Sequence, residues 1–161
     1  MAVQILRALT PANVVAVDRN AEALDHALHL GAHEVVMADE DPAAQVGEIT
    51  KGLGADVTID LVGSDETLAV AAASTRSLGH LTIVGIGRGT LPVSFFSVPY
   101  EMSVATTYWG TLPELVEVID LARTGRITSE VSRFDLDDAP AAYDALRAGT
   151  VRGRAVVQPS G

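Results

Sequence analysis

The sequence contains no cysteine in 161 residues. Disulfide bonds and thiolate metal sites are therefore excluded together. Basic residues are also scarce, because 11 lysines and arginines stand against 21 acidic residues, for a net charge of −10. A surface of that charge repels a phosphate backbone, so we expect no nucleic-acid partner.

Long apolar runs and leader features are missing as well. The longest runs, such as residues 68–73, are far shorter than the roughly 20 residues of a membrane-spanning helix. The N-terminal "MAVQILRAL" is too short and too weakly basic for a signal peptide. We expect a cytoplasmic protein without membrane association. With 48% hydrophobic residues and no linker-like segment, the chain is expected to fold as one domain over residues 1–161.

Short apolar runs alternate with helical patterns along the chain. Four runs of strand type occupy residues 14–17, 34–37, 57–62 and 81–84. This alternation is typical of a parallel sheet with helical crossovers, so the sequence predicts an α/β fold. Residues 129–161 have a different spacing of apolar residues. This segment predicts a strand, a helix ending near Gly149 and a final strand around residues 154–157.

Helix ends are well marked. Asn20 can cap a helix that Gly31 closes, and Ser64 can cap another. Thr111 and Glu114 form a T-x-x-E capping box ahead of an apolar stripe at Leu115, Val118, Ile119 and Ala122.

A further helix is predicted between the second and third strands. Asp41 and Pro42 suit its start, and Val46, Ile49 and Leu53 follow at helical spacing.

An acid, Asp18, ends the first apolar run. In a dinucleotide-binding fold, the acid after the second strand accepts hydrogen bonds from the adenosine ribose hydroxyls. Asp18 fits that position, and it fits equally well a turn at Asp-Arg-Asn that begins the next helix. An acid occurs at the same place in S-adenosylmethionine-dependent methyltransferases, so the residue alone indicates no more than a nucleoside site.

The glycine-rich loop that normally precedes such an acid is absent. G-x-G-x-x-G opens the first helix roughly 20 residues before the acid, and counting back from Asp18 reaches a point before Met1. We therefore expect the chain to begin inside that helix, at "AVQILRALTP", and to lack the first strand. In the usual order 3-2-1-4-5-6 this strand lies between the strands at residues 14 and 57, so the sheet should contain a gap there.

Several segments together resemble a known family. They are "MAVQILRAL…VVAVDRNAEAL…LGAHEVV", "GADVTIDLVGSDETL", "GHLTIVGIG", "YWGTLPELVEVIDLARTGRI" and "LRAGTVRGRAVVQP". They are similar to the cofactor-binding half of zinc-dependent medium-chain alcohol dehydrogenases, most of all to bacterial NAD-dependent secondary alcohol dehydrogenases. The resemblance implies a Rossmann-like doubly wound parallel sheet, truncated at its N-terminal end, with residues 129–161 returning towards a catalytic domain. The family's full subunit is about twice this length.

The resemblance also implies a set of residues that contact NAD. They are Asp18, Arg19, Val62, Gly63, Val84, Gly85, Ile86, Thr107, Trp109 and Arg154. Asp18 would hold the adenosine ribose, with Arg19 beside the adenine, and would disfavour the 2′-phosphate of NADP. Arg154 would reach the pyrophosphate, a role for which Arg152 competes. Where the family often has a lysine, this chain has Ala23.

The nicotinamide end of the cofactor would lie against the later segments. Val62, Gly63 and residues 84–86 would line the ribose and nicotinamide, although residues 84–87 also fit a buried strand that ends in a turn. Thr107 and Trp109 would offer backbone groups to the carboxamide. Tyr108 and Trp109 would face the substrate pocket, although an aromatic pair packed in the core fits the same residues.

Ligands for the family's zinc are not evident. The family places the alcohol oxygen on zinc, which needs three protein ligands, and it takes them from segments upstream of this chain. The candidates here are His26, His29, His33 and His80, and no third ligand accompanies the pair on one helix. We assign no metal site and no catalytic residue.

The expected function therefore depends on context. As part of a full subunit, the chain would bind NAD for hydride transfer between a secondary alcohol and a ketone. Alone it should be inactive, and Met1 falls where the family has ordinary helix residues, which suggests a truncated product or a start assigned too far downstream. The alternative is a non-catalytic nucleotide-binding or oligomerisation module. A methyltransferase is disfavoured, because "RGRAVVQP" and "YWGT" have no evident place in one.

Residues 91–110 are expected to form a contact between two copies of the chain. This segment is apolar and prone to β structure, and at a sheet edge it would otherwise expose unpaired backbone groups. We therefore expect a homo-oligomer.

Overall fold

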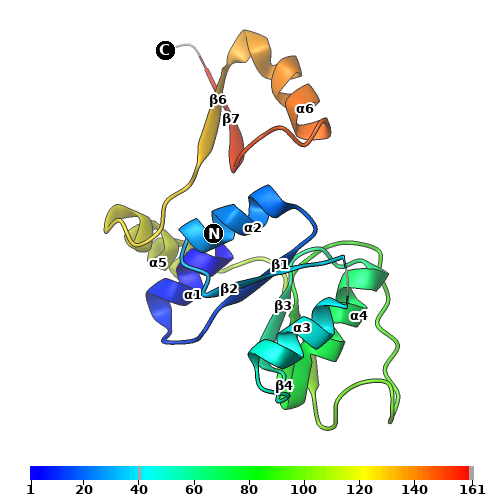
Figure 1. Ribbon diagram of the computed structural model, residues 1–161. Helices are drawn as coiled ribbons and strands as arrows, with labels where there is room; N and C mark the ends of the chain where they lie inside the picture. Colours follow the sequence, from blue (N-terminus) through cyan, green and yellow to red (C-terminus); the bar gives the residue numbers. More distant parts are fainter. Residues whose placement is uncertain (40, 160–161) are drawn as a thin grey trace.

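The computed structural model describes residues 1–39 and 41–159 and shows short helices alternating with short strands (Figure 1). In chain order the elements are α1 (Ala2–Leu9), β1 (Val15–Asp18), α2 (Ala21–His29), β2 (Glu34–Met37), α3 (Pro42–Ile49), β3 (Ala55–Asp60), α4 (Asp65–Ser74), β4 (Thr75–Ile83), β5 (Ser103–Thr106), α5 (Leu112–Arg123), β6 (Val131–Asp135), the 3-10 helix η1 (Leu136–Asp138), α6 (Ala139–Arg147) and β7 (Arg154–Gln158). Within these described ranges, no helix has the length and apolar character required to cross a membrane.

All strand pairs are parallel, as the alternation predicted, but they form three separate sheets. One holds β1 and β2, one holds β3, β4 and β5 in that order, and one holds β6 and β7. Among the described residues β1 pairs only with β2, and β3 pairs only with β4. The gap expected between these two strands is therefore confirmed, and each of them has one open ladder of backbone N–H and C=O groups.

The predicted helix starts are confirmed by their side-chain caps. The Asn20 side chain accepts from the N–H groups of Glu22 and Ala23, and Asp41 accepts from Ala44. Capping boxes are present at Ser64 and Thr111. These caps satisfy donors that the first helical turn leaves without a partner.

The Thr111 capping box also affects a carboxyl group. The Thr111 N–H donates to Glu114 Oε2 at 2.6 Å, and the Thr111 hydroxyl donates to the same atom at 2.8 Å. The backbone hydrogen bond first, and the hydroxyl second, hold the pKa of Glu114 below its ordinary value, because both stabilise the ionised carboxylate.

Four element boundaries differ from the prediction. Leu53 was placed on the third helix, but α3 ends at Ile49 and Leu53 is exposed, because Lys51 and Gly52 adopt left-handed conformations with φ of 55° and 82°. The strands predicted at 57–62 and 81–84 end earlier, at Asp60 and Ile83, where the chain leaves the sheet. The start of β4 at Thr75 was missed because its first residues, Thr-Arg-Ser, are polar.

The hydrophobic core is small for the size of the chain. Its centre is Leu81 on β4, which is fully buried against Ala71 and Ala72 of α4. The accessible surface is 11373 Å², whereas a compact monomer of this mass exposes about 7,700 Å². The apolar stripe predicted on α5 is helical but is not buried, since Leu115 and Ile119 are exposed and only Leu121 of that helix is buried.

The last segment forms a unit of its own. We call residues 129–159 the C-terminal arm, which contains the sheet of β6 and β7 and the helix α6 that packs beside it. In Figure 1 the arm, in orange and red, projects away from the other two sheets and is joined to them by a coil connection after α5. The strand, helix and strand predicted after residue 129 are thereby confirmed.

Candidate functional site

The carboxyl ends of β3, β4 and β5 bring together several segments that the sequence singled out. Because these strands are parallel neighbours, their ends lie at the same edge of the sheet. Val62 and Gly63 follow β3, residues 84–86 follow β4, and residues 107–109 follow β5. Asp18 is the last residue of β1, at the carboxyl end of the neighbouring two-stranded sheet.

One buried acid, Asp60, joins the first two of these segments. Its Oδ1 accepts from the N–H groups of Val62 at 2.6 Å and Gly63 at 2.7 Å. Its backbone carbonyl accepts from Val84 at 2.8 Å and Gly85 at 3.0 Å. Asp60 is 4% exposed, and its Oδ2 has no hydrogen-bond partner among the described residues. The carboxyl group is therefore held through Oδ1 alone.

Asp60 was not among the residues singled out from the sequence. The available signal was an acid inside the apolar run "VTIDLV", a position where a charged side chain needs a partner.

Glycines allow the two segments to touch backbone to backbone. A Cβ on Gly85 would lie 2.2 Å from the carbonyl carbon of Val62, and one on Gly87 would lie 2.3 Å from the Gly63 oxygen. Gly87 also donates its N–H to the Val62 carbonyl at 3.1 Å. Contact with the protein's own backbone is thus sufficient to require glycine at both positions.

Asp18 takes part in the turn at Asp-Arg-Asn, which was one of the two roles that the sequence allowed for this residue. Its Oδ1 accepts from the Asn20 N–H at 2.9 Å, and Asn20 in turn caps α2. Asp18 and Arg19 are both exposed. The turn hydrogen bond engages one carboxylate oxygen, so it does not prevent the exposed carboxylate from meeting a ligand.

The segment after β5 presents an exposed aromatic pair. Tyr108 is 90% exposed and Trp109 is 81% exposed, with the rings 5.5 Å apart in an edge-to-face arrangement. The alternative that these rings pack in the core is therefore wrong for this chain. Both rings line a cleft with Ile5 and Leu9 of α1. The Thr107 N–H donates to the Ile83 carbonyl at 3.1 Å. Of the two backbone groups of Thr107, the carbonyl is therefore the one that can contact a ligand.

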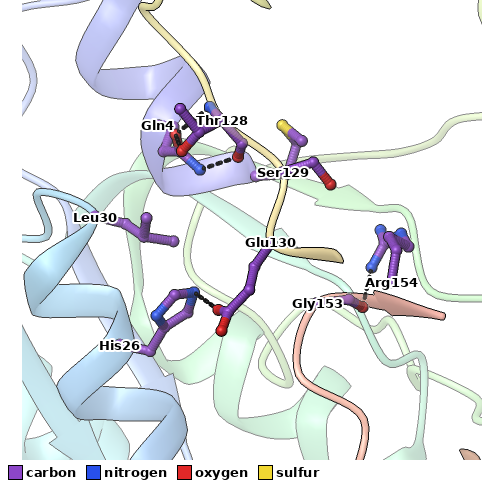
Figure 2. Close-up of a pocket in the computed structure, with 9 residues that line it drawn as sticks. Gln4, His26, Leu30, Thr128, Ser129, Glu130, Gly153 and Arg154 are labelled. Atoms are coloured by element: carbon purple, nitrogen blue, oxygen red, sulfur yellow. Dashed lines mark hydrogen bonds and ion pairs between the residues drawn. The ribbon is translucent and has the colours of Figure 1, made fainter. Parts of the chain in front are cut away.

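Arg154 lines the same cavity as Gln4 of α1 (Figure 2). The cavity there has a volume of about 280 Å³ and is lined by Met1, Gln4, His26, Leu30, Thr128, Ser129, Glu130, Gly153 and Arg154. The pKa of the Met1 amino group is lowered, first by burial and second by the nearby charge of Arg154. The Arg154 guanidinium and the first residues of α1 therefore share one cavity.

The structure separates the two competing arginines. Arg152 pairs with Glu22 of α2, whereas the Arg154 guanidinium donates a hydrogen bond to the neighbouring Gly153 carbonyl at 3.1 Å. Arg154 is thus the one whose guanidinium lies in the cavity at α1.

Three of the four histidines have partners within the fold. His26 lies 3.6 Å from Glu130 (Figure 2), His33 Nδ1 accepts from the Val14 N–H at 2.9 Å, and His80 Nδ1 lies 2.7 Å from the Ser103 hydroxyl. His29 is in the last turn of α2. Across residues 1–39 and 41–159, no group of three His, Cys, Asp or Glu side chains gathers to hold a metal ion.

The chain is similar to known dehydrogenases over nearly its whole length. A sequence profile of a family described as zinc-binding dehydrogenase matches residues 1–124. An NAD-dependent alcohol dehydrogenase of Sulfolobus acidocaldarius is 33% identical, over 98% of this chain and 46% of that protein. A D-arabinose 1-dehydrogenase (NADP(+)) of Saccharolobus solfataricus is 31% identical, over 98% of this chain and 45% of that protein.

Solved structures show the same relationship. The alcohol dehydrogenase of the archaeon Aeropyrum pernix aligns with 98% of this chain and 46% of its own, with a TM-score of 0.88 and 39% identity. The chain therefore spans about half the length of the curated relatives it matches.

The backbone contact at the glycines can be tested by adding one methyl group. We expect Gly87→Ala to lower the free energy of unfolding by about 1–3 kcal/mol, because the new Cβ overlaps the Gly63 carbonyl. The matched control is Gly47→Ala in α3, where nothing lies within 4 Å of the added Cβ. It should raise the stability by about 0.5–1 kcal/mol, through helix propensity. Urea denaturation measures both, and equal effects would refute the contact.

Proposed function

The chain belongs to the zinc-binding dehydrogenase family, and from that premise we propose that it is the NAD-binding portion of an alcohol dehydrogenase. In the complete protein, hydride would pass between a secondary alcohol or ketone and NAD. The observation that supports this most directly is the edge formed by the carboxyl ends of β3, β4 and β5, with Asp18 and Arg154 at other strand ends. Ligands of doubly wound folds bind at that edge.

The adenosine half of the cofactor would bind at the end of β1. The exposed Asp18 carboxylate would accept hydrogen bonds from the ribose hydroxyls, and Arg19 would lie beside the adenine. The relatives include proteins named for NAD and for NADP. We propose NAD for this chain, because a carboxylate repels a 2′-phosphate, while the neighbouring Arg19 makes this a preference rather than an absolute exclusion.

The pyrophosphate would bind in the cavity that Arg154 shares with α1. Arg154 supplies a guanidinium that can donate two hydrogen bonds to phosphate oxygens.

The nicotinamide would bind across the ends of β3, β4 and β5. Its ribose would lie against Val62 and Gly63, and its ring against Val84, Gly85 and Ile86, of which Ile86 is 99% exposed. The carboxamide would meet backbone groups of residues 107–109, where the Thr107 carbonyl is available as an acceptor. Asp60 would keep the first two segments in a fixed relation, so that little ordering is needed on binding.

Tyr108 and Trp109 would contribute to the substrate pocket, because they stand beside the proposed carboxamide position and are exposed. The bound cofactor supplies the hydride acceptor or donor, and these residues would only orient the alcohol or ketone.

The residues of this chain do not fit the family's zinc. The described histidines and carboxylates do not converge in a group of three, and the chain has no cysteine. We therefore assign no step of the reaction to a metal held by this chain. We also propose that residues 1–161 form one nucleotide-binding domain, with residues 129–161 directed towards the rest of the complete protein.

The role of Asp18 gives the sharpest test of cofactor binding. Asp18→Asn keeps an acceptor for the Asn20 N–H and removes the charge. We expect the preference for NAD over NADP to fall at least about tenfold, which corresponds to about 1.4 kcal/mol. The control is Asp25→Asn on the exposed side of α2, which makes the same change in charge. Calorimetric titration with both dinucleotides measures the ratio. An unchanged ratio would restrict Asp18 to the turn, and absence of binding to either would overturn the proposed function.

We further propose that two copies of the chain associate through residues 91–110. Among the strands of residues 1–39 and 41–159, β5 pairs only with β4, on one side. Phe95, Phe96 and Tyr100 are exposed just before it, with Phe96 at 84%, and the rings of Phe95 and Phe96 lie 4.8 Å apart. An apolar patch beside an open strand edge favours self-association.

The proposed interface predicts the behaviour of a double variant. The unmodified chain should sediment as an oligomer, and Phe95→Ser combined with Phe96→Ser should sediment as a monomer, because the apolar patch is removed. Tyr143→Ser on α6, also at an exposed aromatic residue, should leave the oligomer intact. An unmodified chain that stays monomeric over a wide range of concentrations would contradict the interface.

A further inference from the structure

A buried amide on α1 is bonded to the chain at the base of the C-terminal arm. The Gln4 side chain is 9% exposed in a part of the molecule where most side chains are accessible. Its Nε2 donates to the Thr128 carbonyl at 2.9 Å, and its Oε1 accepts from the Thr128 N–H at 2.7 Å and from the Thr128 hydroxyl at 3.3 Å (Figure 2). One side chain thus satisfies both backbone groups of a residue 124 positions away.

This pairing depends on an amide. A glutamine side chain has a donor and an acceptor in one plane, which matches the N–H and C=O of a peptide unit. A carboxylate would place an acceptor against the Thr128 carbonyl, and a thioether would leave both Thr128 groups without partners in a buried place.

Thr128 is connected to Arg154 through one neighbouring residue, Glu130, and a backbone hydrogen bond. Glu130 is two residues after Thr128, and its carbonyl accepts from the Arg154 N–H at 3.0 Å. Beyond it, Val131 pairs with Arg154 at the start of the β6–β7 ladder. A Cβ on Gly153 would lie 2.1 Å from the Glu130 oxygen, so the turn before Arg154 is closed tightly against Glu130.

Other side-chain bonds between the arm and the rest of the described chain are exposed. His26 pairs with Glu130, and Arg152 pairs with Glu22, with side chains between 45% and 71% exposed. Exposed ion pairs contribute about 0–1 kcal/mol each. The elements of the arm pack extensively only against one another. The Gln4–Thr128 pair is therefore the buried polar anchor at the base of the arm, and it lies next to the apolar anchor Ile127, which is 2% exposed.

We propose that Gln4 is a positioning residue that holds Arg154 beside the N-terminal end of α1. This inference rests on the proposed function in one respect, namely that Arg154 is there to bind a pyrophosphate. Gln4 would not touch the dinucleotide. It would act through Thr128 and Glu130. The proposed anion site would then depend on α1 and on the C-terminal arm, which lie at opposite ends of the sequence.

The placement of the arm can be measured without any ligand. Because the chain has no cysteine, Asp25→Cys on α2 and Asp137→Cys in the arm provide two unique sites for spin labels. We expect a narrow distance distribution in the labelled chain and a broad one after Gln4→Met or Gln4→Glu. Thr128→Val removes only the hydroxyl and keeps both backbone hydrogen bonds, so it should retain the narrow distribution. Gln158→Met, an exposed glutamine in the arm, is the matched control.

The distance measurement decides the proposal. A narrow, unchanged distribution in folded Gln4→Met or Gln4→Glu would overturn it, and circular dichroism establishes that each variant is folded. If Gln4→Met does not fold, the isosteric Gln4→Glu variant carries the test.

Titration with inorganic pyrophosphate connects the placement to binding. We expect Gln4→Met and Arg154→Met each to weaken binding about tenfold, and the double variant to be no weaker than Arg154→Met alone, because both changes remove the same contact. Additive losses would mean that Gln4 acts other than through Arg154 and would overturn the proposal. If the unmodified chain does not bind pyrophosphate, the role of Arg154 in the proposed function fails, and the distance measurement still decides the role of Gln4.

Discussion

The contact between the segments after β3 and β4 is the constraint on which the candidate site depends. Asp60 ties the two segments through its carboxylate and its carbonyl, and glycines at positions 63, 85 and 87 let the backbones approach without side chains between them. Because both segments start at the same edge of one sheet, this contact fixes a continuous backbone surface there. A flat nicotinamide ring can lie against such a surface, and side chains such as Ile86 extend from it.

The remaining parts of the site belong to other units of the fold. Asp18 ends a strand of a different sheet, and Arg154 begins a strand in the C-terminal arm. The helix α3 packs against α4 and so joins the first two sheets, but the arm packs mainly on itself, the open ladders of β1 and β3 face a gap and the stripe on α5 is exposed. Polar bonds such as Gln4 to Thr128 consequently have more influence on the relative placement of the units than they would in a continuous core. The lack of a continuous core also explains the large accessible surface. It leaves apolar side chains exposed in residues 91–110, where we propose that two copies associate.

Features set by neighbouring residues could be predicted from the sequence. Asn20, Ser64 and Thr111 cap helices because their partners lie two or three residues away, and the parallel strands followed from the spacing of apolar runs. Features that join distant residues could not be predicted. The double role of Asp60 requires β4 beside β3, and the pairing of Arg152 depends on Glu22, which lies 130 positions away in α2.

The exposed stripe on α5 shows a further limit. Periodicity predicts a helix and its apolar face, but it does not say whether anything covers that face.

Dinucleotide binding at the carboxyl ends of the strands can be followed by titrating the ¹⁵N-labelled chain with NAD and recording the amide resonances. We expect shifts at Asp18, Gly63, Gly85 and Thr107, together with the segment around Arg154, and none at α6 around Tyr143. Shifts confined to residues away from these strand ends, or no saturable shift at any residue, would contradict it.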